Sequence, residues 1–204
     1  MLGARSVTAH ASWHIGPVRL WLRPHRHGER GEPQARELLG QALALEPAQV
    51  PLRRDERGRP SLQPALPDRD TGWSHSGDYL LVGLGQGVRL GVDLERIRAR
   101  PRLLEIAQRF FHADEIALLA GLQPDAQQAL FFRLWCAKEA LLKAYGHGLS
   151  FGLHRLAYAV APDGALQLQW CDPALGHATQ WQLHEWWAAP DCRAALAFYP
   201  LPAE

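Results

Sequence analysis

The 204-residue sequence predicts an α+β fold in two lobes, and three observations support this. Strand-like runs precede residue 96, helical periodicity fills residues 101–144, and strand-like runs return after residue 153. The pattern changes near residues 96–102, where we expect the seam between the lobes. The sequence shows no strong internal repeat, so any duplication of the two halves would have to be structural.

The first half is expected to hold one helix and one hairpin. Residues 34–46 carry leucine and alanine at helical spacing. Two strand-like runs, 79–84 and 88–95, are separated only by Gly85-Gln86-Gly87, which favours a hairpin. The glycine- and serine-rich run 71–78 ahead of them is expected to be a loop.

The second half is expected to begin with helices and to end with a sheet. Apolar residues repeat every three or four positions over residues 103–111, and a second helix start follows at 113–115. The longest helical stretch covers residues 125–144, with Gly146 and Gly148 as candidate C-cap residues. Strand-like runs follow at residues 156–160, 166–170, 180–187 and 194–199.

Charge and cysteine content argue against several classes of protein. The formal net charge is +1, from 22 basic and 21 acidic residues, so no global field favours nucleic acid or an anionic membrane. Cys136, Cys171 and Cys192 are odd in number and contain no C-x-x-C pair, which argues against a disulfide framework or a zinc site. The N-terminus lacks a signal-type apolar segment, and no run approaches 18 apolar residues. We therefore expect a soluble, cytoplasmic protein.

Two carboxylates share one face of a predicted strand. Apolar side chains alternate along residues 90–95, so Asp93 and Glu95 point together to the other side. Such a pair is often an ordinary solvent-facing feature of an edge strand. The nearby Gly91, however, leaves room for a ligand or for another backbone. Carboxylate oxygens at this spacing suit Mg²⁺.

A third carboxylate lies on the long predicted helix. Glu139 and Lys143 are one turn apart, in the orientation favoured for an ordinary surface pair. Trp135 shares their face, which favours a position at the lobe interface. Neither Asp93 nor Glu139 is expected to belong to the core. Three carboxylates and one cation are the ingredients for holding a divalent ion and a phosphate chain together.

The run 71–78 contains Ser74, His75 and Ser76 close to glycines. Backbone N–H groups and an imidazolium in such a loop could bind a phosphate. The serines could instead cap their own backbone, and composition does not decide between these alternatives. A hydrolytic triad is excluded for Ser74, His75 and Asp78, because residues this close in the chain cannot form that geometry.

Two motifs in order carry a resemblance to a known family. The run Gly91-Val92-Asp93-Leu94-Glu95 is followed by Trp135-Cys136-Ala137-Lys138-Glu139-Ala140-Leu141-Leu142-Lys143, and 45 residues separate Asp93 from Lys138. This pair resembles the signature of the 4′-phosphopantetheinyl transferase superfamily. Further blocks in family order are residues 36–40, 58–60, 74–77, 109–111 with Glu115, and 146–150. Chain length resembles the monomeric, two-lobed Sfp-type branch more than the shorter trimeric synthases.

The resemblance implies a pseudo-duplicated fold. Each lobe would be a small antiparallel sheet packed on a long helix, with an N-terminal lobe of residues 1–98 and a C-terminal lobe of residues 99–204. Coenzyme A would bind in the cleft between them. The implied reaction moves 4′-phosphopantetheine from coenzyme A to a serine hydroxyl of an apo acyl or peptidyl carrier protein. It requires Mg²⁺ and releases adenosine 3′,5′-bisphosphate.

The resemblance also implies roles for individual residues. Asp93, Glu95 and Glu139 would bind Mg²⁺ with the pyrophosphate, and Lys143 would neutralise the pyrophosphate and the departing bisphosphate. The serine proton could pass to Glu139 or to a Mg²⁺-bound water ordered by Glu115, and the sequence does not choose between these. The adenosine and 3′-phosphate end of coenzyme A would be held by Arg36, Gly58, Arg59, Pro60, Ser74 and His75.

The chain departs from the family pattern at two places. Arg59 stands where relatives carry lysine, which keeps the charge. The basic pair that relatives carry in the N-terminal third has no clean counterpart. Candidates for it are Arg23, His25, Arg26, His27 and Arg30.

Two other functions could use the same residues. A metal-dependent phosphodiesterase or nuclease could use the carboxylates and Lys143, but the near-zero net charge argues against it. A coenzyme A-binding protein without turnover is the non-enzymatic alternative. The sequence does not identify the carrier protein, but we expect apolar contacts from residues 110–122 and complementary charge from Arg102 and Arg109.

Overall fold

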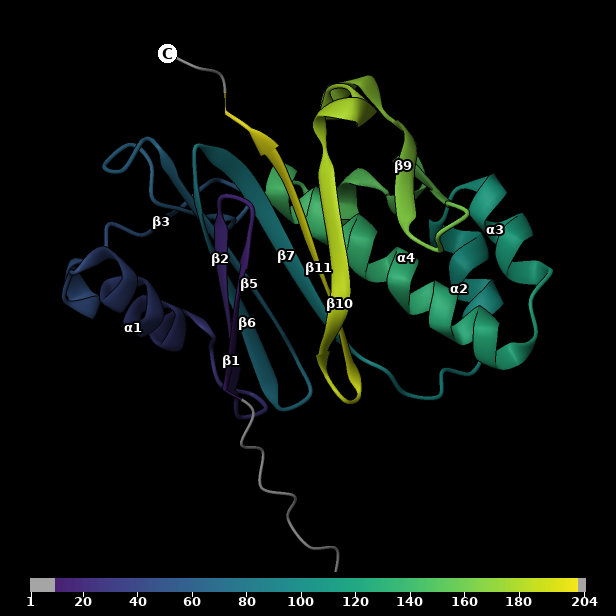
Figure 1. Cartoon of the computed structure of the whole chain (residues 1–204), viewed down its shortest axis with the longest axis horizontal. Helices are drawn as coiled ribbons and strands as arrows, with labels where there is room; N and C mark the ends of the chain where they lie inside the picture. The colour runs from purple at the N-terminus through teal and green to yellow at the C-terminus, as the bar shows by residue number, and fades with distance from the viewer. Residues whose placement is uncertain (1–9, 202–204) are drawn as a thin grey trace, which may run out of the picture.

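The computed structural model describes residues 10–201 and confirms the α+β class. Its elements form four layers, seen side by side in Figure 1: helix α1 (Glu32–Leu43), a four-stranded sheet, a three-stranded sheet, and helix α4 (Pro124–Tyr145). Each sheet therefore has a helix on its outer face. The outermost residues of both predicted lobes lie outside the described part of the chain.

The first sheet is antiparallel and has the strand order β1-β2-β6-β5. Its strands are β1 (Ala11–Ile15), β2 (Val18–Pro24), β5 (Arg69–Ser76) and β6 (Tyr79–Gln86). Between α1 and β5 along the chain lie the 3₁₀ turn η1 (Pro47–Gln49) and the short ladder of β3 (Arg53–Arg54) and β4 (Pro60–Ser61).

The second sheet has the order β10-β11-β7 and draws its strands from both halves of the chain. They are β7 (Val88–Arg96), β10 (Gln182–Ala189) and β11 (Cys192–Pro200). Strand β7 precedes the expected seam, yet it pairs along its whole length with β11 from the end of the chain. The lobe boundary near residue 98 stays a prediction.

The remaining elements surround α4. They are α2 (Leu103–Phe110), α3 (Ala113–Ala120), the ladder of β8 (Leu156–Val160) and β9 (Leu166–Cys171), and the 3₁₀ turns η2 (Gly148–Phe151), η3 (Leu153–Arg155), η4 (Pro173–Leu175) and η5 (Ala178–Gln180). Helix α4 coincides with the predicted helix, and Gly146 ends it in the left-handed region at φ +91°. Among residues 10–201, no helix is long and apolar enough to cross a membrane.

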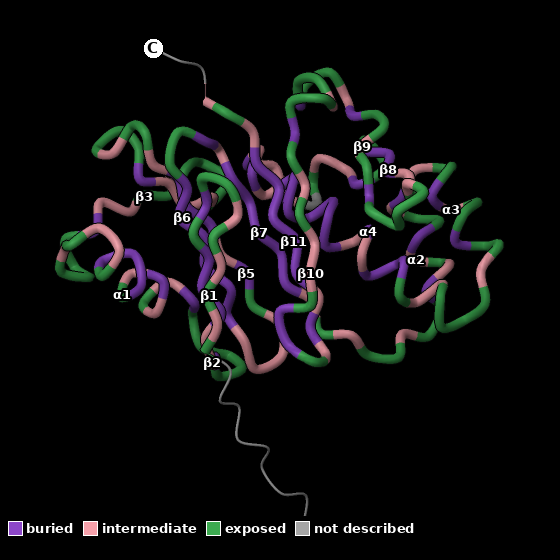
Figure 2. Tube along the Cα trace, viewed as in Figure 1, coloured by how far each residue is buried: buried purple, intermediate pink, exposed green. Residues whose placement is uncertain are grey.

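Three apolar cores fill the spaces between the layers, so the central strands are buried on both faces (Figure 2). Leu39 of α1 packs on Val82 of the first sheet. Leu20 and Leu196 belong to the core between the sheets, and Phe131 of α4 belongs to the core outside the second sheet. The burial of both faces explains the nearly continuous apolar run in β6.

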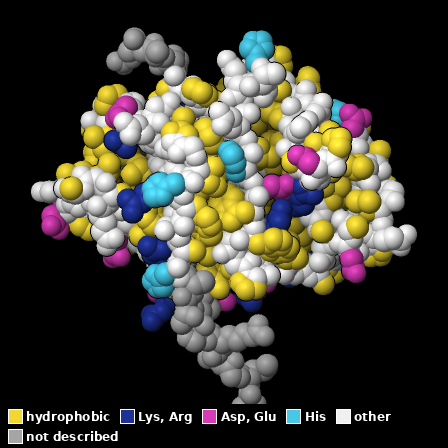
Figure 3. Space-filling view, viewed as in Figure 1, with side chains coloured by type: hydrophobic (Ala, Val, Ile, Leu, Met, Phe, Trp, Pro, Cys, Tyr) yellow, Lys and Arg dark blue, Asp and Glu magenta, His cyan; other side chains and the backbone are white. Residues whose placement is uncertain are grey.

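Strands β1 and β10 are edge strands of the two sheets, and they lie next to each other on one side of the space between the sheets (Figure 1). Figure 3 shows hydrophobic side chains gathered between these strands. Trp13 of β1 and Trp186 of β10 meet there edge to face, with ring centroids 5.5 Å apart. This aromatic contact covers the open side of the inter-sheet core.

The predicted hairpin of residues 79–95 is wrong. Strand β6 pairs with β2 and β5, whereas β7 pairs with β11, so the turn at Gly87 (φ +66°) passes the chain from one sheet to the other. The two strands pack face to face, because Gly83 and Gly85 of β6 leave room for Leu90 of β7. The predicted loop 71–78 is also largely wrong, since residues 69–76 form β5.

Among the glycines of the described chain, Gly91 of β7 is the one that another element approaches most closely, and that element is helix α4. A Cβ added at Gly91 would lie 2.1 Å from the carbonyl oxygen of Ala140 and 2.3 Å from the nitrogen of Ala144. Both neighbours are helix backbone, which cannot rotate away as a side chain can. Glycine at this position therefore sets how closely α4 approaches β7, and the space beside Gly91 is filled by a second backbone.

We predict that Gly91→Ala lowers the free energy of unfolding by about 3 kcal/mol or more, because the methyl group has to push the helix away from the strand. Gly72→Ala is the matched control, since its Cβ would meet Leu90 Cδ1 at an ordinary 3.7 Å. The control is expected to stay within about 1 kcal/mol of the parent protein. Urea unfolding measures both values, and equal losses would show that the close approach at Gly91 is not limiting.

Candidate active site

Strands β5 and β7 lie side by side where the two sheets meet, and side chains of β5 connect them. Asp70 Oδ2 accepts a hydrogen bond from Leu90 N at 2.8 Å, and Ser76 Oγ accepts one from Arg96 N at 3.0 Å. These contacts satisfy backbone donors on the edge of β7 that β11 does not use. The result is a polar seam between the two sheets.

At the middle of this seam, three side chains from three elements form a closed triangle. Lys143 Nζ of α4 lies 2.6 Å from Asp93 Oδ1 of β7 and donates to Ser74 Oγ of β5 at 3.0 Å. Ser74 Oγ in turn donates to Asp93 Oδ1 at 2.9 Å. The structure thus brings Asp93 and Lys143 together as expected, and it adds Ser74 to them.

Glu95 and Glu139 lie beside this triangle. Glu95 follows Asp93 by two residues on the same face of β7 and accepts a hydrogen bond from Ser76 Oγ at 3.3 Å. Glu139 precedes Lys143 by one helical turn. Asp93 is 3% exposed and Glu139 is 7% exposed, so the expectation that neither belongs to the core is wrong. Both are buried because α4 lies directly against β7 at Gly91.

Burial and mutual repulsion destabilise the ionised carboxylates. Burial first, and then the charge of Asp93, raises the pKa of Glu139 to about 7. The same two causes raise the pKa of Glu95. For Lys143, burial acts to lower the pKa, but contact with Asp93 outweighs it and the pKa is raised. The cluster therefore favours a cation among its carboxylates.

The oxygen atoms of the cluster fit a divalent cation. Asp93 Oδ2 and Glu139 Oε1 are buried and have no hydrogen-bond partner within residues 10–201. Unpaired buried carboxylate oxygens are costly unless a cation covers them, and such oxygens are the ligands that Mg²⁺ prefers. No three Asp, Glu, His or Cys side chains of the described chain are already grouped as metal ligands. Asp93 Oδ1 is instead held by Lys143.

A cavity of about 270 Å³ adjoins Lys143 at the seam. Three of the residues predicted to hold the adenosine end, Gly58, Arg59 and Pro60, line it. Trp73, Gly91, Gly146 and His147 line it too. Sequence reasoning did not assign Trp73 or His147 to this site. The sequence could have indicated both residues, because Trp73 precedes Ser74 and His147 lies in the glycine-rich segment that follows the long helix.

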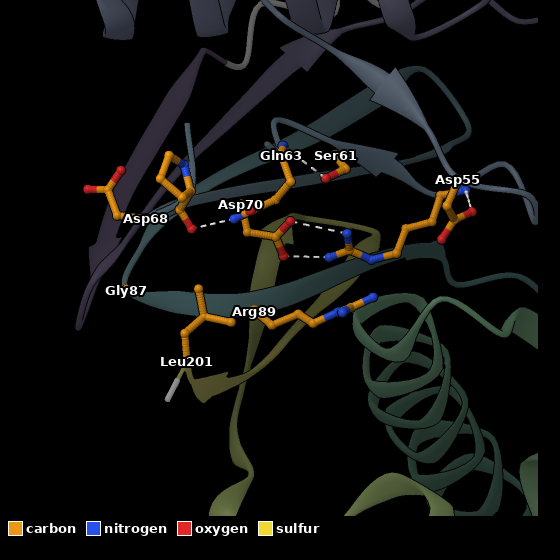
Figure 4. Close-up of a pocket in the computed structure, with 10 residues that line it drawn as sticks. Asp55, Ser61, Gln63, Asp68, Asp70, Gly87, Arg89 and Leu201 are labelled. Atoms are coloured by element: carbon orange, nitrogen blue, oxygen red, sulfur yellow. Dashed lines mark hydrogen bonds and ion pairs between the residues drawn. The ribbon is translucent and has the colours of Figure 1, made fainter. Parts of the chain in front are cut away.

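Arg59 does not present a free guanidinium to this cavity. Its Nε donates to Lys143 O at 3.0 Å, and its two terminal nitrogens bind the carboxylate of Asp70 and the carbonyls of Pro60 and Leu90. Figure 4 shows the forked pair with Asp70 on the wall of a larger neighbouring cavity of about 760 Å³. The predicted phosphate contact of Arg59 thus has no donor left to make it. The residue ties the 55–60 loop to α4 and β7.

His75 and Arg36, also predicted to hold the coenzyme, do not line the cavity beside Lys143. The His75 ring is exposed and lies 5.2 Å from the ring of His25, which follows β2. Burial and the neighbouring His25 lower the pKa of His75. Arg36 of α1 is bound by Glu32 at 3.1 Å and by the carbonyl of Val50 at 2.9 Å. The phosphate-binding roles of both residues stay predictions.

The structure does not bring Glu115 to the cluster. Its side chain is fully buried at the start of α3, 2.7 Å from the equally buried Lys138 Nζ. It also accepts hydrogen bonds from the backbone nitrogens of His112 and Tyr158, at 3.1 Å and 2.9 Å. Every contact of its carboxylate is thus internal to the C-terminal half. This geometry does not support the predicted role of ordering a metal-bound water.

Comparison with known proteins places this geometry in context. The sequence model of the 4′-phosphopantetheinyl transferase superfamily matches residues 89–197, which include α4 and most of β7 and β11. A 4′-phosphopantetheinyl transferase of Bacillus pumilus is 35% identical over 139 residues, covering 68% of this chain and 58% of the relative. The 4′-phosphopantetheinyl transferase HetI of Nostoc is 34% identical over 164 residues, covering 79% and 66%. The chain thus spans less than two thirds of these relatives.

Solved structures show a weaker likeness. The holo-[acyl-carrier-protein] synthase of Thermotoga maritima superposes with a TM-score of 0.45 at 18% sequence identity. The superposition covers 54% of this chain and 62% of that one.

The buried pair of Glu115 and Lys138 predicts strong coupling in a double-mutant cycle. Removing one partner, as in Glu115→Gln or Lys138→Met, leaves the other charge buried and should cost about 3–5 kcal/mol of unfolding free energy. The double variant should cost clearly less than the sum, with a coupling of about 2 kcal/mol or more. Urea unfolding of the four proteins measures it. Additive losses would mean that the two charges do not depend on each other.

Proposed function

The chain belongs to the 4′-phosphopantetheinyl transferase superfamily, and we propose that it transfers 4′-phosphopantetheine from coenzyme A to a serine of an apo carrier protein. The released product is adenosine 3′,5′-bisphosphate. The observation that carries this proposal is the group of Asp93, Glu139 and Lys143 at the lobe seam, beside a cavity that continues toward Gly58 and Trp73. If the metal and the pyrophosphate of coenzyme A are held by Asp93, Glu139 and Lys143, the adenosine end of coenzyme A faces this cavity.

Asp93, Glu95 and Glu139 would hold Mg²⁺. When bound there, the cation would polarise the pyrophosphate oxygens and neutralise part of their charge. The support from this chain is the pair of unpartnered buried oxygens on Asp93 and Glu139.

The side chains have separate tasks in the proposed transfer. The serine oxygen bonds to the phosphorus on the pantetheine side, and the bond from that phosphorus to the bridging oxygen breaks with its electrons on the bisphosphate. Lys143 neutralises the charge on the pyrophosphate and on this leaving group. In the protein without a metal, burial raises the pKa of Glu139 to about 7. We propose that its carboxylate accepts the serine proton.

Recognition of the carrier protein belongs to the same proposal. We place the carrier on the C-terminal lobe near α2 and α3, where Arg102 and Arg109 are exposed. Cationic side chains there would complement an acidic carrier helix. The proposed enzyme acts in the cytoplasm as a monomer, with residues 1–98 holding the adenosine end of coenzyme A.

Incubation with coenzyme A, Mg²⁺ and a panel of apo carrier proteins tests the function. Mass spectrometry should show the gain of one phosphopantetheine group per carrier, and a carrier whose acceptor serine is alanine should gain nothing. Failure to modify any carrier, together with metal-dependent cleavage of DNA, would favour the nuclease alternative. Binding of coenzyme A without any product would favour the non-enzymatic one.

Glu139→Gln should lower the transfer rate by about 100-fold or more while leaving the fold intact. Burial and repulsion by Asp93 disfavour the ionised form of Glu139 and so raise its pKa. The amide of the variant cannot ionise, so at pH 8 without metal it does not carry this cost. A glutamate with a raised pKa destabilises the folded state once it ionises, so the variant should unfold at an equal or higher urea concentration. Glu46→Gln, at an exposed position, is the control and should keep full activity. An active Glu139→Gln would contradict the proposed role.

A further inference from the structure

The carboxylate cluster contains one ammonium group in direct contact. Lys143 Nζ touches Asp93 Oδ1, and the other nearby cation, Arg100, influences Glu95 only through its charge. Arg100 itself lies over the rings of Phe132 and Trp135 at 5.8 Å. Of the three carboxyl groups, Asp93 alone is thus in direct contact with the Lys143 ammonium.

Lys143 contacts only part of the carboxylate cluster. Its Nζ contacts Asp93 Oδ1 and Ser74 Oγ. Asp93 Oδ2 and Glu139 Oε1 are buried without partners in the described part of the chain. The carboxylates are close enough to repel one another, yet they do not form a grouped metal site within residues 10–201. The contact with the Lys143 ammonium keeps the Asp93 carboxylate apart from such a group.

The choice of lysine at this position is informative. Lys138 and Lys143 are the two lysines of the whole sequence, and the remaining 20 of its 22 Lys and Arg residues are arginines. An ammonium on a flexible four-carbon stem can leave one acceptor for another without the fixed fork geometry of a guanidinium. Lys138 is locked between buried groups, whereas the side chain of Lys143 is 34% exposed toward the cleft.

We propose that Lys143 and the divalent cation exchange at Asp93. Without the cation, the ammonium of Lys143, held by Ser74, neutralises Asp93. The cation binds to Asp93, Glu95 and Glu139 and displaces the Lys143 ammonium from Asp93. The displaced ammonium then faces the cleft, where it can contact a phosphate. The inference rests on the proposed function for the identity of the phosphate ligand, but the exchange itself requires only the protein and the cation.

The exchange explains two features together. It accounts for buried carboxylates that lack a ready-made metal geometry, because Asp93 is held elsewhere until the cation arrives. It also couples the binding steps, since the ammonium becomes available to a phosphate only after the cation has bound. Cation binding should therefore strengthen the binding of a pyrophosphate ligand through Lys143 as well as through the metal.

Nuclear magnetic resonance of the lysine ammonium groups tests the exchange directly. Protein labelled with ¹⁵N-lysine contains only two such side chains, Lys143 and the internal reference Lys138. Titration with Mg²⁺ alone, without coenzyme A, should shift the Lys143 signal and leave that of Lys138 in place. A Lys143 signal that stays unchanged at saturating Mg²⁺ overturns the proposal.

Mn²⁺ titration by calorimetry provides the matched comparison. Lys143→Met should bind Mn²⁺ roughly tenfold more tightly than the parent, because the competing charge is gone. Arg100→Met removes a cation that lies near Glu95 but touches no carboxylate, and its affinity should rise much less. Equal gains in both variants, or no gain in Lys143→Met, contradict the exchange.

If Lys143→Met does not fold, Ser74→Ala provides a second test of the exchange. It removes one acceptor of the ammonium and should also raise the Mn²⁺ affinity, with both lysines still in place. Unchanged affinity in this variant counts against the proposal. The carrier-modification assay is run on the parent protein in parallel. Transfer without a Lys143 shift refutes the exchange alone, whereas a shift without transfer refutes the proposed function alone.

Discussion

The contact on which the site depends is the meeting of two backbones at Gly91. Because this residue has no side chain, α4 lies against β7 at Ala140 and Ala144. Glu139 and Lys143 immediately precede those two alanines, so the same contact brings their side chains toward Asp93. A larger residue at this point would separate helix and strand, and with them the carboxylates and the ammonium. The chemistry of the seam thus follows from a packing constraint.

The seam combines polar function with apolar surroundings. Burial raises the pKa of Glu139 to about 7 and leaves oxygens of Asp93 and Glu139 without partners. These features destabilise the folded protein, and the contact of Lys143 with Asp93 offsets part of that cost. The second lysine of α4, Lys138, is fully buried with Glu115 and joins α3 to the helix. One helix therefore carries one ammonium group that is fully buried with Glu115 and one that contacts Asp93 at the seam.

The sequence predicted what depends on local pattern. The limits of α4 follow from apolar periodicity and Gly146, and the grouping of Asp93, Glu139 and Lys143 follows from strand and helix periods combined with two family motifs. The sequence did not predict which distant strands pair with each other. The turn at Gly87 resembles a hairpin turn, but the partner of β7 is β11, a hundred residues later, and only the packing of both lobes selects it. The internal use of Arg59 depends likewise on groups from three elements.

We propose that Asp93 and Glu139 form one cation site across the contact at Gly91. Anomalous diffraction from a crystal of the protein with Mn²⁺ would locate the bound cation. We expect one strong peak within ligand distance of both carboxylates, with Lys143 Nζ no longer bound to Asp93. A peak elsewhere, or a peak at this place with the bond between Lys143 and Asp93 intact, would overturn this assignment.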